Sequence, residues 1–211
     1  MSTTTRPRLV VSKCLEFEHC RWDGQSVTSH IVRNLMPHVD FITVCPEVEI
    51  GLGIPRKPLR IVSEAGERRL VQPATGSDLT DRMNEFAKTF LSSLPEIDGF
   101  VLKSRSPTSG IKDARMYETG GGVVTSRRGG PGFFGRSILD AFPHLPIEDE
   151  GRLRNSRIKD HFLTAVFTLA SFRAVKASGS SDELAEFHSR NQLLFEAHNR
   201  ELAAELGRLA S

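Results

Sequence analysis

Three short apolar segments in the first half of the chain have the length and composition of buried strands. They cover residues 9–12, 41–44 and 99–102, are rich in Val, Ile, Leu or Phe, and lack strict alternation, as expected for strands covered on both faces. Between them, residues 26–36 and 79–94 carry apolar side chains at helical spacing. Strands that alternate with helices predict an α/β domain with a Rossmann-like, mainly parallel sheet.

The segment 105–135 has a different composition from its surroundings. It contains two glycine-rich stretches, residues 120–122 and 129–132, so we expect much of it to be loop. A loop of this length inside a compact domain is either functional or a flexible connector.

The pattern becomes all-helical after about residue 148. Apolar positions at helical spacing predict a helix over residues 155–177, which the sequence Ser178-Gly179-Ser180 ends. Ser180 and Glu183 match a capping box, and the helix that they open runs to Leu209. We therefore divide the chain into an α/β domain, residues 1–148, and a C-terminal all-helical extension, residues 149–211.

Composition excludes several classes of protein. Of 211 residues, 38% are hydrophobic and 26% are charged, and the formal net charge is +2, which describes a globular chain rather than a collagen-like or disordered one. The polar start, residues 1–8, does not resemble a secretion signal. Three cysteines, an odd number, argue against a disulfide framework. We expect a cytoplasmic protein with reduced thiols.

The cysteines occupy informative positions. Cys14 comes two residues after the first apolar segment, Cys45 directly follows the second, and Cys20 lies in a polar stretch between them. The third segment leads into a Ser-Pro loop that contains Ser106. Because the carboxyl ends of parallel strands meet at one edge of a sheet, we expect these residues and Glu47 to share one crevice.

Three functions of the thiols remain open at this point. Free cysteines are often small buried apolar side chains. Zinc needs a fourth ligand, which His19, His30 or His38 supplies in a Cys3His site, although the spacing differs from that of short zinc knuckles. An iron–sulfur cluster held by three thiolates leaves one iron free to act as a Lewis acid. Spacing alone does not separate zinc from a cluster.

Four short motifs follow one another along the chain. They are Val10-Val11-Ser12-Lys13-Cys14-Leu15, Cys20-Arg21-Trp22-Asp23-Gly24, Val44-Cys45-Pro46-Glu47, and Lys103-Ser104-Arg105-Ser106-Pro107 with Gly110. In this order they resemble the TudS thiouracil desulfidase family over residues 7–145. The tail, with Phe187-His188-Ser189-Arg190-Asn191 and Ala197-His198, is similar to the start of a YbgA-type helical module, a pairing that resembles the RudS enzymes acting on 4-thiouridine in transfer RNA.

The resemblance implies a mechanism. Cys14, Cys20 and Cys45 would hold a [4Fe-4S] cluster with one iron open to the sulfur of the substrate. Oxygen from water then replaces that sulfur without net electron transfer, and hydrosulfide is released. Glu47 matches the catalytic residue that moves protons, and Ser106 matches the residue that orients the base or the water. Read without the resemblance, Glu47 is a solvated carboxylate and Ser106 a turn residue.

Other residues bear on the substrate. Arg21 and Lys103 lie within the motifs and are expected to bind it, and Trp22 can stack on a pyrimidine, although a lone Trp more often packs in a core or at its rim. Residues 103–128 and 152–176 carry an excess of Lys and Arg, which suits a phosphate-rich partner as well as a solvated face. Ser109 stands where many family members have Cys.

These observations lead to one hypothesis and two alternatives. The hypothesis is a [4Fe-4S]-dependent desulfidase that acts on 4-thiouridine in transfer RNA, with the helical extension, part of a YbgA-type domain, as a candidate RNA-binding region. The first alternative is the same chemistry on free 4-thiouracil or 4-thiouridine monophosphate. The second is a non-catalytic RNA-binding protein stabilised by zinc.

Overall fold

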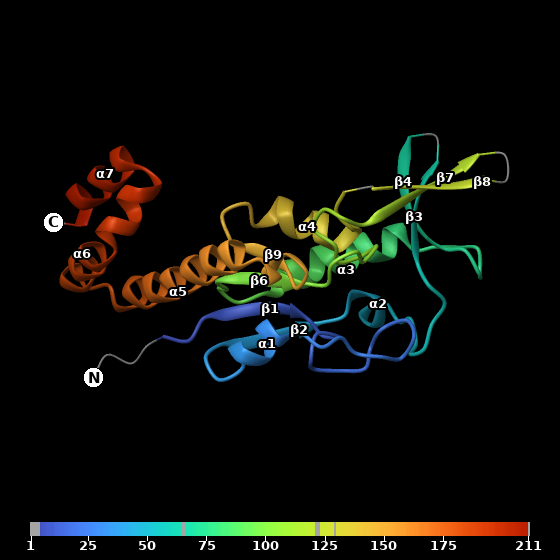
Figure 1. Cartoon of the computed structure of the whole chain (residues 1–211), viewed down its shortest axis with the longest axis horizontal. Helices are drawn as coiled ribbons and strands as arrows, with labels where there is room; N and C mark the ends of the chain where they lie inside the picture. Colours follow the sequence, from blue (N-terminus) through green and yellow to red (C-terminus); the bar gives the residue numbers. More distant parts are fainter. Residues whose placement is uncertain (1–4, 65, 121–122, 129, 211) are drawn as a thin grey trace.

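The computed structural model describes residues 5–64, 66–120, 123–128 and 130–210. Its centre is a four-stranded sheet in which all neighbours are parallel, in the order β2-β1-β6-β9. The strands span Arg8–Ser12 (β1), Asp40–Val44 (β2), Gly99–Leu102 (β6) and Ile147–Asp149 (β9). The predicted Rossmann-like parallel sheet is therefore confirmed (Figure 1).

Helices cover both faces of this sheet. They span His30–Leu35 (α1), Thr80–Ser93 (α3), Phe133–Ala141 (α4) and Ser156–Ser178 (α5). On one face, Val10 of β1 packs in a cluster with Met83 of α3 and with α4. On the other face, Val11 packs in a second cluster with Phe162 of α5 and with α1. Burial on both faces explains why the strands are continuously apolar.

A second sheet projects from one end of the molecule, in the order β5-β4-β3-β7-β8 (Figure 1). Its strands span Arg60–Glu64 (β3), Glu67–Gln72 (β4), Ser77–Asp78 (β5), Arg115–Gly120 (β7) and Val123–Arg128 (β8). The expectation that residues 105–135 are mostly loop is therefore wrong for β7 and β8; Gly121, Gly122 and Gly129 lie outside the described residues. Strand β7 pairs with β3, which lies far from it in the chain. The glycine content of residues 105–135 reports only on local backbone preference, so it cannot reveal this pairing.

The first helix is shorter than the apolar pattern of residues 26–36 predicts. Only His30–Leu35 is helical, because the residues before it are held in an extended conformation. Val27 forms a β-bridge with Leu15, and the Ser29 N–H donates to the carboxylate of Glu16.

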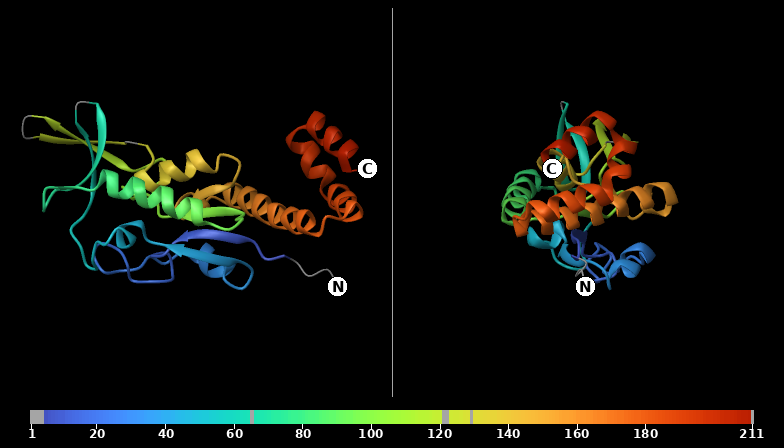
Figure 2. Two further views of the ribbon diagram at one scale, coloured as in Figure 1. Left: turned by 180° about the vertical axis from the view of Figure 1, so that it is seen from behind. Right: turned by 90° about the vertical axis from the view of Figure 1, so that its left-hand side faces the viewer.

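The C-terminal region is helical, as expected. Ser180 caps α6 (Ser181–His198), where its hydroxyl accepts a hydrogen bond from the Glu183 N–H at 3.2 Å. The helix predicted to run to Leu209 is two helices, because the Asn199 side chain accepts from the Leu202 N–H at 3.1 Å and starts α7 (Arg200–Ala210). Helices α6 and α7 lie at the end of the molecule opposite the second sheet (Figures 1 and 2).

Helix α5 belongs to the covering of the parallel sheet. Its Phe162 and Val166 are buried with Leu9 and Val11 of β1. Arg173, further along α5, binds the carboxylate of Asp98 at 2.9 Å. The division of the chain at residue 148 stays a prediction. No helix in the described part of the chain is long and apolar enough to cross a membrane.

The Arg173–Asp98 pair predicts a large loss of stability on mutation. Its side chains are only 11% and 2% exposed, so Arg173→Ala leaves a buried carboxylate without its cation and should cost about 3–5 kcal/mol in free energy of unfolding, measured with urea. Lys176→Ala is the control on the same helix: its pair with Glu96 is 58% and 50% exposed and should contribute about 0–1 kcal/mol. Equal losses in the two variants would contradict the prediction.

Candidate active site

The ends of β1, β2 and β6 meet at one edge of the parallel sheet. Ser12 pairs with Val44 in register, and its hydroxyl accepts a hydrogen bond from the Lys103 N–H at 2.9 Å. A cavity of about 310 Å³ opens at this edge. The structure brings all the site residues expected from the sequence to its wall: Cys14, Cys20, Arg21, Cys45, Glu47, Lys103 and Ser106.

The three thiols are buried, and the Cys45 thiol donates to the Cys20 carbonyl oxygen at 3.6 Å. Cys14, Cys20 and Cys45 are all free of disulfides. The hydrogen bond from the Cys20 thiol lowers the pKa of Cys14. The same bond raises the pKa of Cys20 to about 11. The pKa of Cys45 is raised by its hydrogen bond to Cys20 and then by burial. Cys14 therefore has the lowest pKa of the three thiols.

A buried arginine, which the sequence did not single out, joins the thiols to the carboxylate. The Arg56 side chain is 5% exposed. Its Nε donates to Glu47 Oε2 at 2.7 Å, its Nη1 to the Cys20 carbonyl at 2.9 Å, and its Nη2 to Cys45 Sγ at 3.9 Å. The only sequence signal is a basic residue in the Gly- and Pro-containing loop that follows Cys45.

The other oxygen of Glu47 contacts the Ser-Pro loop. Thr108, which is buried and was also missed, donates its hydroxyl to Glu47 Oε1 at 3.0 Å. The Ser106 hydroxyl lies 2.9 Å from the Thr108 hydroxyl and accepts from the Ser109 N–H at 3.0 Å. Glu47, Thr108 and Ser106 thus form one polar chain along the cavity wall.

Helix α4 is hydrogen-bonded to the backbone of the Ser-Pro loop. The Phe133 N–H donates to the Pro107 carbonyl at 3.1 Å, and the Gly135 N–H donates to the Thr108 carbonyl at 2.9 Å. A Cβ at Gly135 would lie 2.3 Å from the Gly110 carbonyl oxygen. Glycine is therefore required for the helix to approach the loop this closely.

The two expected substrate-binding cations already have acidic partners. Arg21 pairs with Asp23 at 3.2 Å, and Lys103 pairs with Glu150. Trp22 is 46% exposed and lines the cavity. An exposed indole at the mouth of a cavity is suited to stacking rather than to core packing.

The structure does not bring a histidine to the thiols. His19, His30 and His38 are exposed, and none of them lines this cavity. Within the described residues, no group of three or more His, Cys, Asp or Glu side chains is arranged to hold a metal ion. The Cys3His zinc site considered from the sequence is therefore not formed by these residues.

The fold and the cavity define a class of protein: an α/β protein with buried thiols and a carboxylate at the carboxyl edge of a parallel sheet, the edge where open α/β sheets bind ligands. The chain belongs to the 2-thiouracil desulfurase family, whose model matches residues 9–150. The predicted family is thereby confirmed.

Individual proteins with similar chains were also found. A Bacillus subtilis (strain 168) protein named "Uncharacterized protein YbbK" is 32% identical over an alignment of 109 residues, and the match covers 48% of this chain and 72% of that protein. A solved structure of the "[4Fe-4S]-dependent thiouracil desulfidase TudS" is 28% identical, with a TM-score of 0.49, and the match covers 71% of this chain and 94% of that one.

The Arg56–Glu47 contact predicts strong energetic coupling. Arg56→Met leaves the largely buried Glu47 carboxylate without its cation and should lower the free energy of unfolding in urea by about 3–5 kcal/mol. The double variant Arg56→Met/Glu47→Leu should lose less than the sum of the two single variants. Arg21→Met, which breaks the more exposed pair with Asp23, is the control and should cost about 0–1 kcal/mol. Additive losses for Arg56 and Glu47 would contradict this coupling.

Proposed function

We propose that this protein replaces the sulfur of a thiolated uracil by oxygen, and that its substrate is 4-thiouridine in transfer RNA. One observation carries the proposal: three buried cysteines share a cavity of about 310 Å³ with Glu47 in a chain of the 2-thiouracil desulfurase family. The overall change is balanced as thiocarbonyl plus water giving carbonyl plus hydrogen sulfide, so no oxidant or reductant is needed.

The donor set suits an iron–sulfur cluster, because such clusters are held by cysteine thiolates. Cys14, Cys20 and Cys45 all line one cavity. These three residues would hold a [4Fe-4S] cluster. When bound, the cluster supplies an iron without a protein ligand, which acts as a Lewis acid toward the sulfur of the substrate. Because ligation requires reduced thiols, we place the protein in the cytoplasm.

The residues of the chain supply the proton transfers and the positioning. Glu47 accepts a proton from the attacking water and delivers it to the departing sulfur. Arg56 holds one oxygen of that carboxylate at 2.7 Å and Thr108 holds the other at 3.0 Å, so the side chain is fixed before the substrate enters. Ser106, at the end of the same polar chain, orients the base or the water.

Exposed groups at the mouth favour a base presented by an RNA. Trp22 is 46% exposed, and the Arg105 side chain is 79% exposed; both line the cavity. Proteins recognise unstacked RNA bases by stacking on aromatic rings and on guanidinium planes. The alternative is the same reaction on free 4-thiouracil or its nucleotide. Hydrosulfide release from transfer RNA containing 4-thiouridine, compared with release from free 4-thiouracil, separates the two.

We expect all three cysteines to be required for binding the cluster. Protein purified without oxygen should contain about four iron and four sulfide per chain and absorb in the visible range, whereas Cys14→Ser, Cys20→Ser and Cys45→Ser should each lose the iron, the colour and hydrosulfide release together. Ser109→Ala changes a neighbouring wall residue that ligates nothing and should keep the iron. A colourless protein loaded with zinc would instead support the non-catalytic alternative.

Glu47→Gln separates binding of the cluster from catalysis. The amide keeps the size of the side chain but cannot accept a proton, so turnover should fall by about 10²–10⁴-fold while the iron and sulfide content stays unchanged. Thr108→Val, which removes the hydroxyl that contacts Glu47 Oε1, should have a smaller effect. Hydrosulfide release at the wild-type rate from Glu47→Gln would remove this residue from the mechanism.

A further inference from the structure

The second sheet has one face in the core and a second face that points away from it. Ile61 of β3 is opposite Leu70 of β4, and both side chains are fully buried in the core. Successive residues of a strand point to opposite faces, so the residues between the buried ones lie on the other side of the sheet. We call this side the outer face; on β3 and β7 it consists of Arg60, Val62, Arg115 and Tyr117.

Two arginines of the outer face lie side by side without acidic partners. Arg60 and Arg115 are the first residues of the parallel strands β3 and β7, and the residues that follow them, Ile61 and Met116, are paired. Both arginines are exposed, and neither forms an ion pair with any residue that the structure describes. Like charges on adjacent strands are unfavourable for a sheet by itself, so this end of the outer face is suited to an anionic partner.

An aromatic ring positions one of these cations. The Arg60 guanidinium lies over the Tyr117 ring, 4.7 Å from its centroid, a contact that holds the cation against the sheet. A guanidinium binds phosphate oxygens in pairs and stacks on flat rings, which a lysine ammonium cannot do. The six basic residues in the strands of the second sheet are all arginine: Arg60, Arg68, Arg69, Arg115, Arg127 and Arg128.

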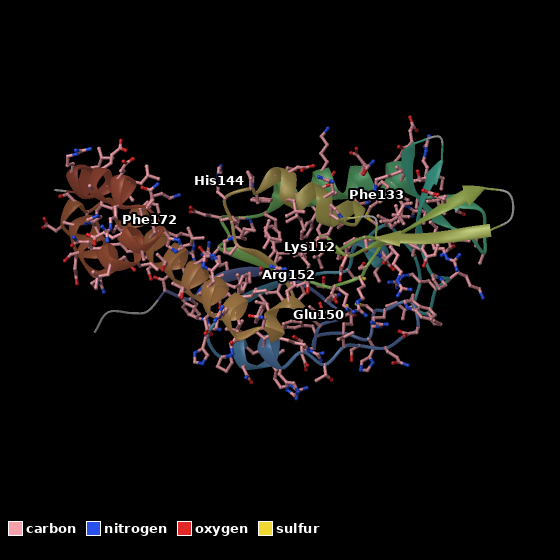
Figure 3. All side chains as sticks on the ribbon, turned by 45° about the horizontal axis from the view of Figure 1, so that its top comes forward. Lys112, Phe133, His144, Glu150, Arg152 and Phe172 are labelled. Carbon is pink, nitrogen blue, oxygen red and sulfur yellow. The ribbon has the colours of Figure 1, made fainter. Side chains whose placement is uncertain are left out.

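The outer face begins close to the cysteine cavity. Arg60 follows Arg56, a residue of the cavity wall, by four positions, and four residues span at most about 14 Å. Lys112, which is exposed and labelled in Figure 3, lies between the Ser-Pro loop and Arg115 along the chain. A polyanion with one unit in the cavity can therefore reach these cations with the units next to it.

The C-terminal helices have the opposite balance of charge. Helices α6 and α7 contain six Asp or Glu and three Lys or Arg, whereas the strands of the second sheet contain four Asp or Glu and six Arg. Binding to RNA depends mainly on cations that displace the counterions of its phosphates. Charge therefore favours the second sheet over the helical extension, which the sequence indicated as a candidate RNA-binding region.

We propose that the outer face of the second sheet is the docking surface for the RNA backbone that flanks the reacting nucleotide, with Arg60, Lys112 and Arg115 contacting phosphates. The exposed guanidinium over Tyr117 also offers a surface on which a flanking base can stack. This inference rests on the proposed function for the choice of RNA as partner. It adds that the RNA lies along β3 and β7 and not on α6 and α7.

Binding of an unreactive RNA tests this surface without turnover. The holoprotein is titrated with a dye-labelled transfer RNA transcript that lacks 4-thiouridine, and fluorescence anisotropy is followed at several salt concentrations. Arg60→Gln/Arg115→Gln should weaken binding by at least about tenfold and reduce the slope of log affinity against log salt concentration by about 1–2, because two phosphate contacts are lost. Arg60→Lys/Arg115→Lys keeps both charges and should keep most of the slope.

The matched control removes the same charge from the other end of the chain. Arg190→Gln/Arg200→Gln replaces two exposed arginines of α6 and α7 and should leave the affinity and the slope close to those of the wild type. All substituted positions are exposed, and unfolding of each variant in urea verifies that the fold is intact.

Each outcome supports or overturns the surface. Unchanged binding by Arg60→Gln/Arg115→Gln overturns it, and so do equal losses in the two glutamine variants, since the effect is then one of net charge. A larger loss in Arg190→Gln/Arg200→Gln assigns the RNA to the helices instead. Weaker binding by the lysine variant with an unchanged slope supports the surface and identifies contacts that need the guanidinium plane.

Hydrosulfide release tests the proposed function separately. If RNA binding depends on the outer face as expected but no thiolated substrate releases hydrosulfide, the docking surface stands and the proposed function fails. If the wild type releases hydrosulfide from free 4-thiouracil but does not bind the transfer RNA, the docking surface is overturned and the desulfidase chemistry stands.

Discussion

Parallel pairing of β1 with β2 on one side and with β6 on the other is the constraint on which the rest of the structure depends. It brings three carboxyl ends together, so that Cys14, Cys45 and the Ser106 loop reach one cavity although they are far apart in the chain. A shift of one residue in any of these pairings would turn the alternating side chains to the opposite face. The close packing of particular side chains, Val10 in one cluster and Val11 in the other, opposes such a shift, so the core also fixes the geometry of the site.

The sheet brings the thiols and Glu47 to one cavity, and the Arg56 guanidinium connects them there. It contacts the Cys20 carbonyl, the Cys45 sulfur and the Glu47 carboxylate, so one side chain links the thiols to the group that we propose transfers protons. A buried cation of this kind is stable only when most of its donors have partners. Through these contacts the loop that carries Arg56 is joined to the cysteine segment, so we expect changes in one to affect the other.

The cavity at the carboxyl edge of the sheet holds the thiols, the Glu47 carboxylate and basic side chains together, so a bound base would lie beside every group that the proposed reaction needs. Helices α6 and α7 lie at the end of the molecule opposite the second sheet (Figure 2).

The sequence by itself determined the parallel sheet, the cap at Ser180 and the grouping of the cysteines with Glu47, because apolar periodicity and strand-end positions are local signals that the core must respect. It did not reveal β7 and β8, whose pairing with β3 depends on residues distant in the chain. Nor did it reveal Arg56 or Thr108. Their roles follow from which side chains meet after folding, and only the tertiary structure decides those contacts.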